Sequence, residues 1–205
     1  MMTDSRINLP LADLSGDETA RLMAWIPELE LITSHEARER CLRVWAAAWR
    51  VGNWPDPEQA PTLPDVAVGA GANLIGHTGR VMQACRGVAL ALVPGAGPVD
   101  LNLLLESAAL HDVAKLVEYE PAPEGFRLSE IGRSVHHAAI GAQWALMAGS
   151  PPPVARAIYA HTPQVRAAPD TIEAVILFAV DQIDADAIWL TSGHSASIKR
   201  ALLGG

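Results

Sequence analysis

Five short polar segments follow one another along the chain, and their histidine and aspartate side chains are of the kinds that bind metal ions. They are the HisThrGlyArg segment at His77, the adjacent pair His111 and Asp112, then His137, His161 and Asp181. Six nitrogen and oxygen ligands are as many as two neighbouring divalent ions would need. The set combines imidazole nitrogens with carboxylate oxygens and contains no thiolate. Iron, manganese, cobalt, nickel and zinc suit such a set better than magnesium, because magnesium prefers more oxygen ligands. The sequence therefore predicts a centre for two divalent ions from this group of metals.

The adjacent pair lies beside the apolar stripe of a predicted helix. Leu104, Ala108 and His111 recur at intervals of three and four residues, and Asp112 and Lys115 flank the same stripe. Burying the Asp112 carboxylate without a partner would cost several kcal/mol. A bound cation or a firm hydrogen-bond network is therefore needed to explain the pair.

Only one of the neighbouring residues His136 and His137 can face such a centre, because successive helical side chains are about 100° apart. His136 shares its stripe with the bulky Trp144, whereas His137 shares its stripe with Gly141 and Ala145. Small residues let helices approach and leave room for metal. We therefore select His137.

Helical periodicity dominates the sequence, and no sustained alternating run indicates a sheet. The fold class predicted is all-α, a compact helical bundle with an N-terminal helical extension. Helices are predicted at about 17–30, 34–51, 72–92, 100–117, 130–148, 152–161, 170–190 and 195–202. The first is expected to kink or end at Pro27, and Thr33 with Glu36 offers a capping box for the second. Residues 1–71 form the extension with a Pro-rich connector, and 72–205 the main domain, packed together as one unit.

Composition excludes several classes of protein. A formal net charge of −8 and a pI near 5.3 argue against an extended nucleic-acid-binding surface. No apolar run approaches the roughly 20 residues that a membrane-spanning helix needs, and residues 1–14 lack the basic and then apolar pattern of a secretory signal, so neither feature is expected. Cys41 and Cys85 are expected as reduced, buried thiols, which suits a cytoplasmic protein.

The ordered segments resemble those of a known family. AlaLeuHisAspValAlaLys, HisAlaAlaIleGlyAla, AlaIleTyrAlaHisThr and ValAspGlnIleAspAla, preceded by HisThrGlyArg, are similar to the HD-domain superfamily of metal-dependent phosphohydrolases over roughly residues 73–190. The resemblance implies a first metal site and a second that shares the Asp112 carboxylate as a bridge. The first would comprise His77, His111, Asp112 and Asp181, and the second His137 and His161 with Asp112.

Three basic residues near these segments are candidates for contact with substrate. Lys115 lies one turn beyond the HisAsp pair and is expected to act in catalysis with Asp112, by stabilising charge on the transferred group. Arg80 and Arg133 are expected to bind the anionic substrate. The acidic segment 118–128 lies between two ligand-bearing helices and is expected to border the pocket.

The leading functional hypothesis is a metal-dependent phosphohydrolase, a phosphomonoesterase or phosphodiesterase. It would act on a small nucleotide or other phosphate ester through a metal-bound hydroxide. The resemblance also allows a di-iron oxygenase that cleaves a carbon bond of a small polyol or organophosphonate. A third hypothesis is a non-catalytic regulator that binds a nucleotide. The helices before residue 72 could cap the site or form a homodimer surface.

Overall fold

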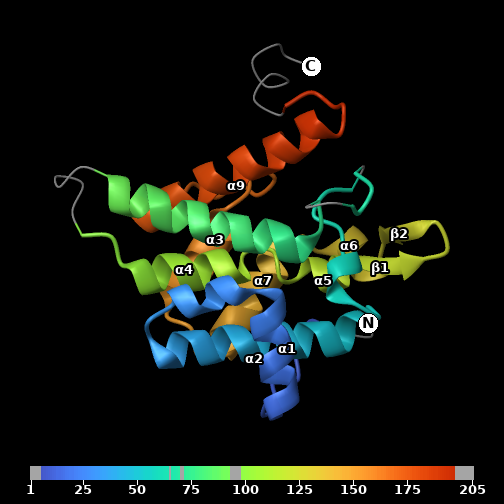
Figure 1. Cartoon of the computed structure of the whole chain (residues 1–205), viewed down its shortest axis with the longest axis horizontal. Helices are drawn as coiled ribbons and strands as arrows, with labels where there is room; N and C mark the ends of the chain where they lie inside the picture. Colours follow the sequence, from blue (N-terminus) through green and yellow to red (C-terminus); the bar gives the residue numbers. More distant parts are fainter. Residues whose placement is uncertain (1–5, 65, 70–71, 93–97, 197–205) are drawn as a thin grey trace.

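A computed structural model of the chain describes residues 6–64, 66–69, 72–92 and 98–196. Helices make up most of it, as the all-α prediction requires (Figure 1). The N-terminal part holds α1 (Gly16–Trp25), the 3-10 helix η1 (Pro27–Leu31), α2 (His35–Gly52) and the 3-10 helix η2 (Pro57–Gln59). The rest holds α3 (Leu74–Ala91), α4 (Leu101–Leu110), α5 (Lys115–Glu118), β1 (Tyr119–Ala122), β2 (Gly125–Leu128), α6 (Glu130–Ser134), α7 (His137–Met147), α8 (Pro152–Ala160) and α9 (Ile172–Thr191).

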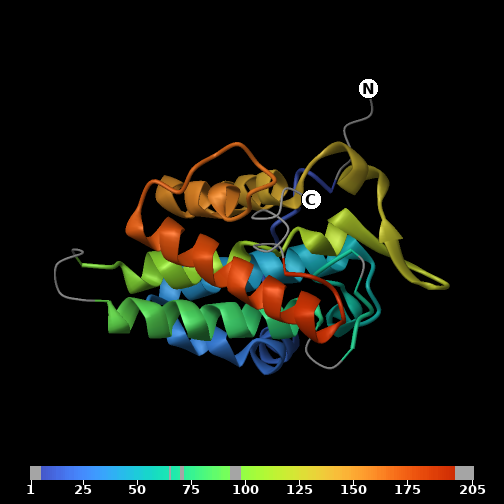
Figure 2. The same cartoon turned by 90° about the horizontal axis from the view of Figure 1, so that it is seen from above.

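The helices of the second part surround the segment between α4 and α5. α3 packs against α4 and α9, α8 packs against α4 and α9, and α7 pairs with α8. Seen from above, α9 runs between α3 and the α7–α8 pair (Figure 2). Polar groups on the inner faces of these helices are therefore directed toward a common region.

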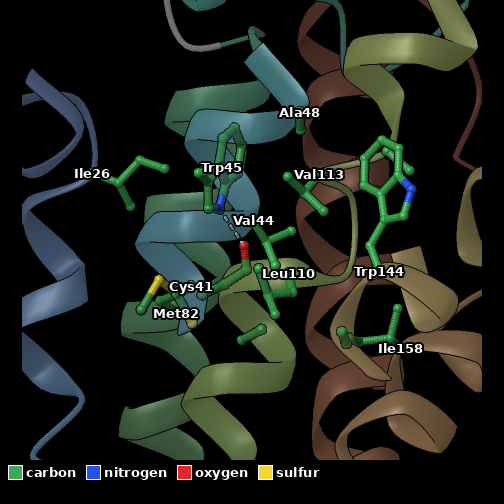
Figure 3. Close-up of a cluster of buried hydrophobic side chains, with 14 of the residues drawn as sticks. Ile26, Cys41, Val44, Trp45, Ala48, Met82, Leu110, Val113, Trp144 and Ile158 are labelled. Carbon is green, nitrogen blue, oxygen red and sulfur yellow. Dashed lines mark hydrogen bonds between the residues drawn. The ribbon is translucent and has the colours of Figure 1, made fainter. Parts of the chain in front are cut away.

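The N-terminal helices share one hydrophobic core with the rest. Trp45 of α2 is fully buried, and its Nε1 donates a hydrogen bond of 2.8 Å to the carbonyl oxygen of Ala109 (Figure 3). Ile26, Leu110 and Val113 belong to the same cluster. Burying a large indole whose N–H is satisfied stabilises this contact strongly. α2 is thus packed directly against the elements that carry the HisAsp pair.

Two predicted helices are each interrupted at or next to a candidate ligand. The helix predicted at 100–117 is wrong as a single element, because α4 ends at Leu110 and residues 111–114 form turns before α5. The backbone there closes shorter hydrogen bonds, from Val113 N to Leu110 O and from Lys115 N to Asp112 O. The helix predicted at 130–148 is likewise divided at Val135 and His136.

A short β-hairpin lies between α5 and α6, where the sequence shows no sustained alternating run. β1 and β2 pair antiparallel with Tyr119 opposite Leu128, and the turn uses Gly125 with φ of 120°. A positive φ at this position favours glycine. The hairpin projects from one end of the bundle (Figures 1 and 2). Its strands are four residues each, too short for their alternation to stand out in the sequence.

The ends of several elements also differ from expectation. α1 ends before Pro27, which begins η1, so the predicted break there is confirmed. The capping box on Thr33 is wrong, because Ser34 caps α2 and Thr33 instead donates to Asn102 Oδ1 on α4. The final helix predicted at 195–202 falls largely outside the described residues.

Both cysteines are buried free thiols, as expected. Among the helices that the structure describes, none combines the length and apolar character needed to cross a bilayer.

Candidate metal centre

The six candidate ligands meet at the centre of the bundle, although they come from five separate places in the chain. Each is at most 6% exposed. α3 supplies His77, the turn after α4 supplies His111 and Asp112, and α9 supplies Asp181. His137 begins α7, and His161 follows the last residue of α8. Because the backbone turns at 111–114, the adjacent residues His111 and Asp112 both reach the centre.

The two oxygens of the Asp112 carboxylate face two different groups of histidines. Oδ2 lies 3.3 Å from His77 Nε2 and 3.5 Å from His111 Nε2. Oδ1 lies 3.1 Å from His137 Nε2 and 3.4 Å from His161 Nε2. Asp112 therefore belongs to two clusters at once.

Asp181 completes the first of these clusters. Its Oδ1 lies 3.1 Å from His77 Nε2 and 3.4 Å from His111 Nε2, and those two ring nitrogens are themselves 3.1 Å apart. The ligand atoms of each cluster all lie within 4.8 Å of one another. Two groups of residues that share Asp112 could therefore each hold a metal ion, one with His77, His111, Asp112 and Asp181 and the other with Asp112, His137 and His161.

Several inward-facing atoms have no satisfactory partner within the protein. Both carboxylate oxygens of Asp112 and Nε2 of His137 are buried and make no hydrogen bond of acceptable geometry among the described residues. Lys115 Nζ does lie 2.7 Å from Asp112 Oδ2, so that oxygen has charge compensation. Leaving such atoms unsatisfied is costly, and a cation would satisfy them together. The donor set fits a divalent ion with nitrogen and oxygen ligands.

Every one of these histidines is held on its outer side by an oxygen atom. Nδ1 of His77 lies 2.7 Å from Asp184 Oδ2, and Nδ1 of His137 lies 3.0 Å from Glu118. Nδ1 of His111 and of His161 faces the carbonyl oxygen three residues earlier. An Nδ1–H donor to each oxygen leaves the Nε2 lone pair directed at the centre, which is the tautomer that binds metal.

Asp184 lies on the outer side of the centre, and its contact with His77 was not predicted from the sequence. It lies three residues after Asp181 on α9, and its carboxylate also accepts from Arg80, with Nε to Oδ1 at 2.7 Å and Nη2 to Oδ2 at 2.9 Å. Helical spacing from Asp181 was the signal that could have found it. Arg80, expected to bind substrate, is thus placed on the outer side of His77.

The structure does not bring Arg133 to the centre. Its Nη1 donates to the carbonyl oxygen of Leu128 at 2.7 Å, and its side chain is exposed beside the hairpin. His136 caps α7 by accepting from Ala138 N, and its Nε2 lies 2.6 Å from Gln164 Oε1. Of the two neighbouring histidines, His137 is the one that contacts Asp112.

Lys115 is the basic residue that does reach the centre. Its side chain is buried, and Nζ lies 2.7 Å from Asp112 Oδ2 and donates to the carbonyl oxygen of Thr62 at 2.6 Å. Burial alone would lower the pKa of Lys115, but the Asp112 charge outweighs it and raises that pKa. An ammonium group is therefore held beside the carboxylate shared by the two clusters.

Charge pairing also controls the protonation of the ligands. Burial opposes the charged form of His77, yet the nearby carboxylates of Asp112, Asp181 and Asp184 overcome it and raise the pKa of His77 to about 10. Burial likewise opposes ionisation of Asp112, but the charges of Lys115 and His111 hold its pKa well below the usual range. A metal ion binding at His77 would therefore displace a proton at neutral pH.

A cavity of about 190 Å³ opens onto the centre. Beyond the candidate ligands and Lys115, its lining includes Thr62, Thr162, Gln164, Gln182, Asp186 and Trp189. A larger, open hollow of about 910 Å³ lies against α1 and α2, but it contains none of the six candidate ligands. Of these two hollows, the smaller is the one that the buried ligand atoms reach, so it is the candidate active-site cavity.

Replacing Asp184 by asparagine is expected to weaken metal binding by about 10- to 100-fold. The amide cannot hold the His77 imidazole and the Arg80 guanidinium as the carboxylate does. Titration of the metal-free protein with Mn²⁺ measures the effect, and Glu124→Gln at the exposed hairpin turn is the matched control. Equal affinity in the Asp184→Asn and Glu124→Gln proteins would show that Asp184 does not support the centre.

Comparison with protein families agrees with this geometry. A family model described as HD domain matches residues 74–186, just over half of the chain. No curated protein and no solved structure shows a significant match to the chain. The matched segment contains all six candidate ligands, together with Asp184 and Lys115. The chain belongs to the HD-domain superfamily of metal-dependent phosphohydrolases.

Proposed function

We propose that the protein is a phosphohydrolase with two divalent metal ions, which acts on a small phosphate ester. The observation that carries the proposal is the position of the Asp112 carboxylate, because its two oxygens face two separate histidine groups at 3.1–3.5 Å. Two bound ions would supply a nucleophile at neutral pH and stabilise the oxygens of a phosphate ester during in-line displacement.

Lys115 is proposed to bind the substrate next to this centre. An ammonium group has three N–H donors. The Thr62 carbonyl and the Asp112 carboxylate account for two of them, by their distances of 2.6 and 2.7 Å. The third remains for an oxygen of the transferred phosphate, where a fixed positive charge would stabilise the charge that develops during the reaction.

The size and charge of the cavity favour a substrate with a single phosphate. Its volume of about 190 Å³ is small for a nucleoside triphosphate. Among the described residues that line it, Lys115 is the only arginine or lysine, while Asp186 adds negative charge at the cavity. A small nucleotide or other ester with one phosphate matches this lining better than a polyphosphate.

A second candidate is a di-iron oxygenase, and the scarcity of basic side chains specifically favours it. Arg80 pairs with Asp184, and Arg133 binds a hairpin carbonyl, so neither is placed to neutralise a phosphate. A weakly charged polyol would need no such neutralisation. The same donor set suits iron.

Phosphate release under anaerobic conditions distinguishes the two candidates. The protein would be purified without a chelating column, analysed for metal, loaded with Mn²⁺ and assayed against a panel of small phosphate esters. The hydrolase proposal expects release of inorganic phosphate without oxygen. Oxygen consumption by an iron-loaded protein, with no phosphate release from any ester, would favour the oxygenase instead.

A further inference from the structure

The connector between α2 and α3 forms part of the cavity, although it precedes the segment that matches the HD domain. Thr62, Leu63 and Pro64 all line the cavity. This connector, drawn in cyan and teal, passes beside α5 (Figure 1), where Trp54 Nε1 donates to the carbonyl oxygen of Leu116 at 2.9 Å. The wall of the cavity is therefore built partly from residues outside the matched segment.

Backbone contacts fix the connector immediately before Thr62. Leu74 N donates to the carbonyl oxygen of Ala60 at 2.9 Å, and Pro61 pairs with Asn73 in an isolated β-bridge. Asn73 in turn caps α3, the helix that carries His77. Because its neighbours are held in this way, Thr62 has a defined position relative to His77 and Lys115.

The carbonyl oxygen of Thr62 makes a hydrogen bond within the protein, whereas its hydroxyl group makes none among the described residues. Its carbonyl oxygen accepts the 2.6 Å hydrogen bond from Lys115 Nζ. Thr62 is only 1% exposed, yet its Oγ1 has no hydrogen-bond partner among the described residues. Buried hydroxyl groups are nearly always paired, because leaving one unpaired destabilises the fold. Thr62 therefore combines a position in the cavity lining with a buried hydroxyl that a bound ligand would satisfy.

We propose that Thr62 is a substrate-binding residue: its carbonyl oxygen positions Lys115, and its hydroxyl donates a hydrogen bond to an oxygen of the bound phosphate. This inference rests on the proposed hydrolase function. The connector then takes part in substrate selection, because it supplies two polar contacts that the HD-matched segment does not contain. Oγ1 and the third N–H of Lys115 would bind the same phosphate group.

The test compares Thr62→Val, which keeps the shape and removes the hydroxyl, with Thr62→Ser, which keeps the hydroxyl. Both are made in the full chain and loaded with Mn²⁺. Affinity for inorganic phosphate is measured by calorimetry, and kcat and KM are measured on an ester that the wild type hydrolyses. Thr62→Val is expected to lower phosphate affinity and kcat/KM by about tenfold or more, and Thr62→Ser is expected to stay close to the wild type.

The Tm measured without phosphate provides an independent test, because Thr62→Val is expected to affect stability and phosphate binding in different ways. Thr62→Val is expected to keep or raise the Tm, because a methyl group replaces an unpaired buried hydroxyl. Thr191→Val, on the outer end of α9, is the control for a threonine outside the cavity. If Thr62→Val does not fold, Thr62→Ala provides the same loss of the hydroxyl.

Failure of the Thr62 proposal can be distinguished from failure of the hydrolase proposal. Wild-type phosphate affinity and kcat/KM in the hydroxyl-free variant would overturn the role of Thr62 and leave the hydrolase proposal intact. A metal-loaded wild type that neither binds inorganic phosphate nor hydrolyses any ester would overturn both.

Discussion

Replacing Asp112 by asparagine is expected to abolish metal binding at both clusters and to lower kcat/KM by a factor of about 10⁴ or more. Among the described residues, Asp112 is the carboxylate whose two oxygens face the two histidine groups, so its charge serves both. Metal content after gel filtration and turnover of a phosphate ester measure the two effects. A variant that keeps its full metal content and activity would contradict the shared role of Asp112.

The same substitution is expected to destabilise the metal-free protein by about 3–5 kcal/mol. Lys115 would keep its buried charge and lose the carboxylate 2.7 Å away. The double variant Asp112→Asn/Lys115→Met removes both charges and should recover most of that stability in denaturant unfolding. It also provides a folded protein in which the loss of metal can be measured. Equal instability of the single and double variants would show that the ion pair is not the cause.

Replacing Lys115 by methionine is expected to lower kcat by about 10²- to 10³-fold while both metal ions remain bound. Lys115 contacts Asp112 and the Thr62 carbonyl but supplies no metal ligand. The ammonium charge beside the transferred phosphate is lost, whereas the donor atoms of both clusters are unchanged. Metal analysis and steady-state kinetics separate this result from that of Asp112→Asn, in which metal and activity fall together.

Arg156→Met is the matched control for Lys115→Met. Arg156 is an exposed basic residue on α8 that pairs with Asp170. The Arg156→Met substitution should leave both kcat and metal content unchanged. Wild-type kcat in the Lys115→Met protein would contradict the proposed role of Lys115, and loss of metal would show that the ammonium group supports the centre instead.

The resemblance to the HD-domain superfamily supplied the grouping of the six polar residues. Helical periodicity was sufficient to predict the bundle and the inward placement of the HisAsp pair. It was not sufficient to predict the turn at residues 111–114. The sequence there, from Leu110 to Lys115, contains no glycine or proline and continues the apolar pattern. The turn is set by tertiary contacts, among them burial of Val113 in the core shared with α2. The pattern of neighbouring residues in the sequence does not reveal such tertiary contacts.

The contacts outside the clusters could not be predicted for a related reason. Asp184 and His77 are 107 residues apart, and nothing in either local sequence indicates their pairing. Thr62 contributes a backbone carbonyl, which every residue possesses. Arg80 had the spacing of a substrate-binding residue, but a carboxylate on another helix holds its guanidinium. Such roles depend on packing between distant segments.

Anomalous diffraction from crystals of the Mn²⁺-loaded protein tests the central claim most directly. The account predicts two manganese peaks, one beside His77, His111 and Asp181 and the other beside His137 and His161, both in contact with Asp112. A single peak, or manganese bound away from Asp112, would contradict a two-metal centre organised by that carboxylate.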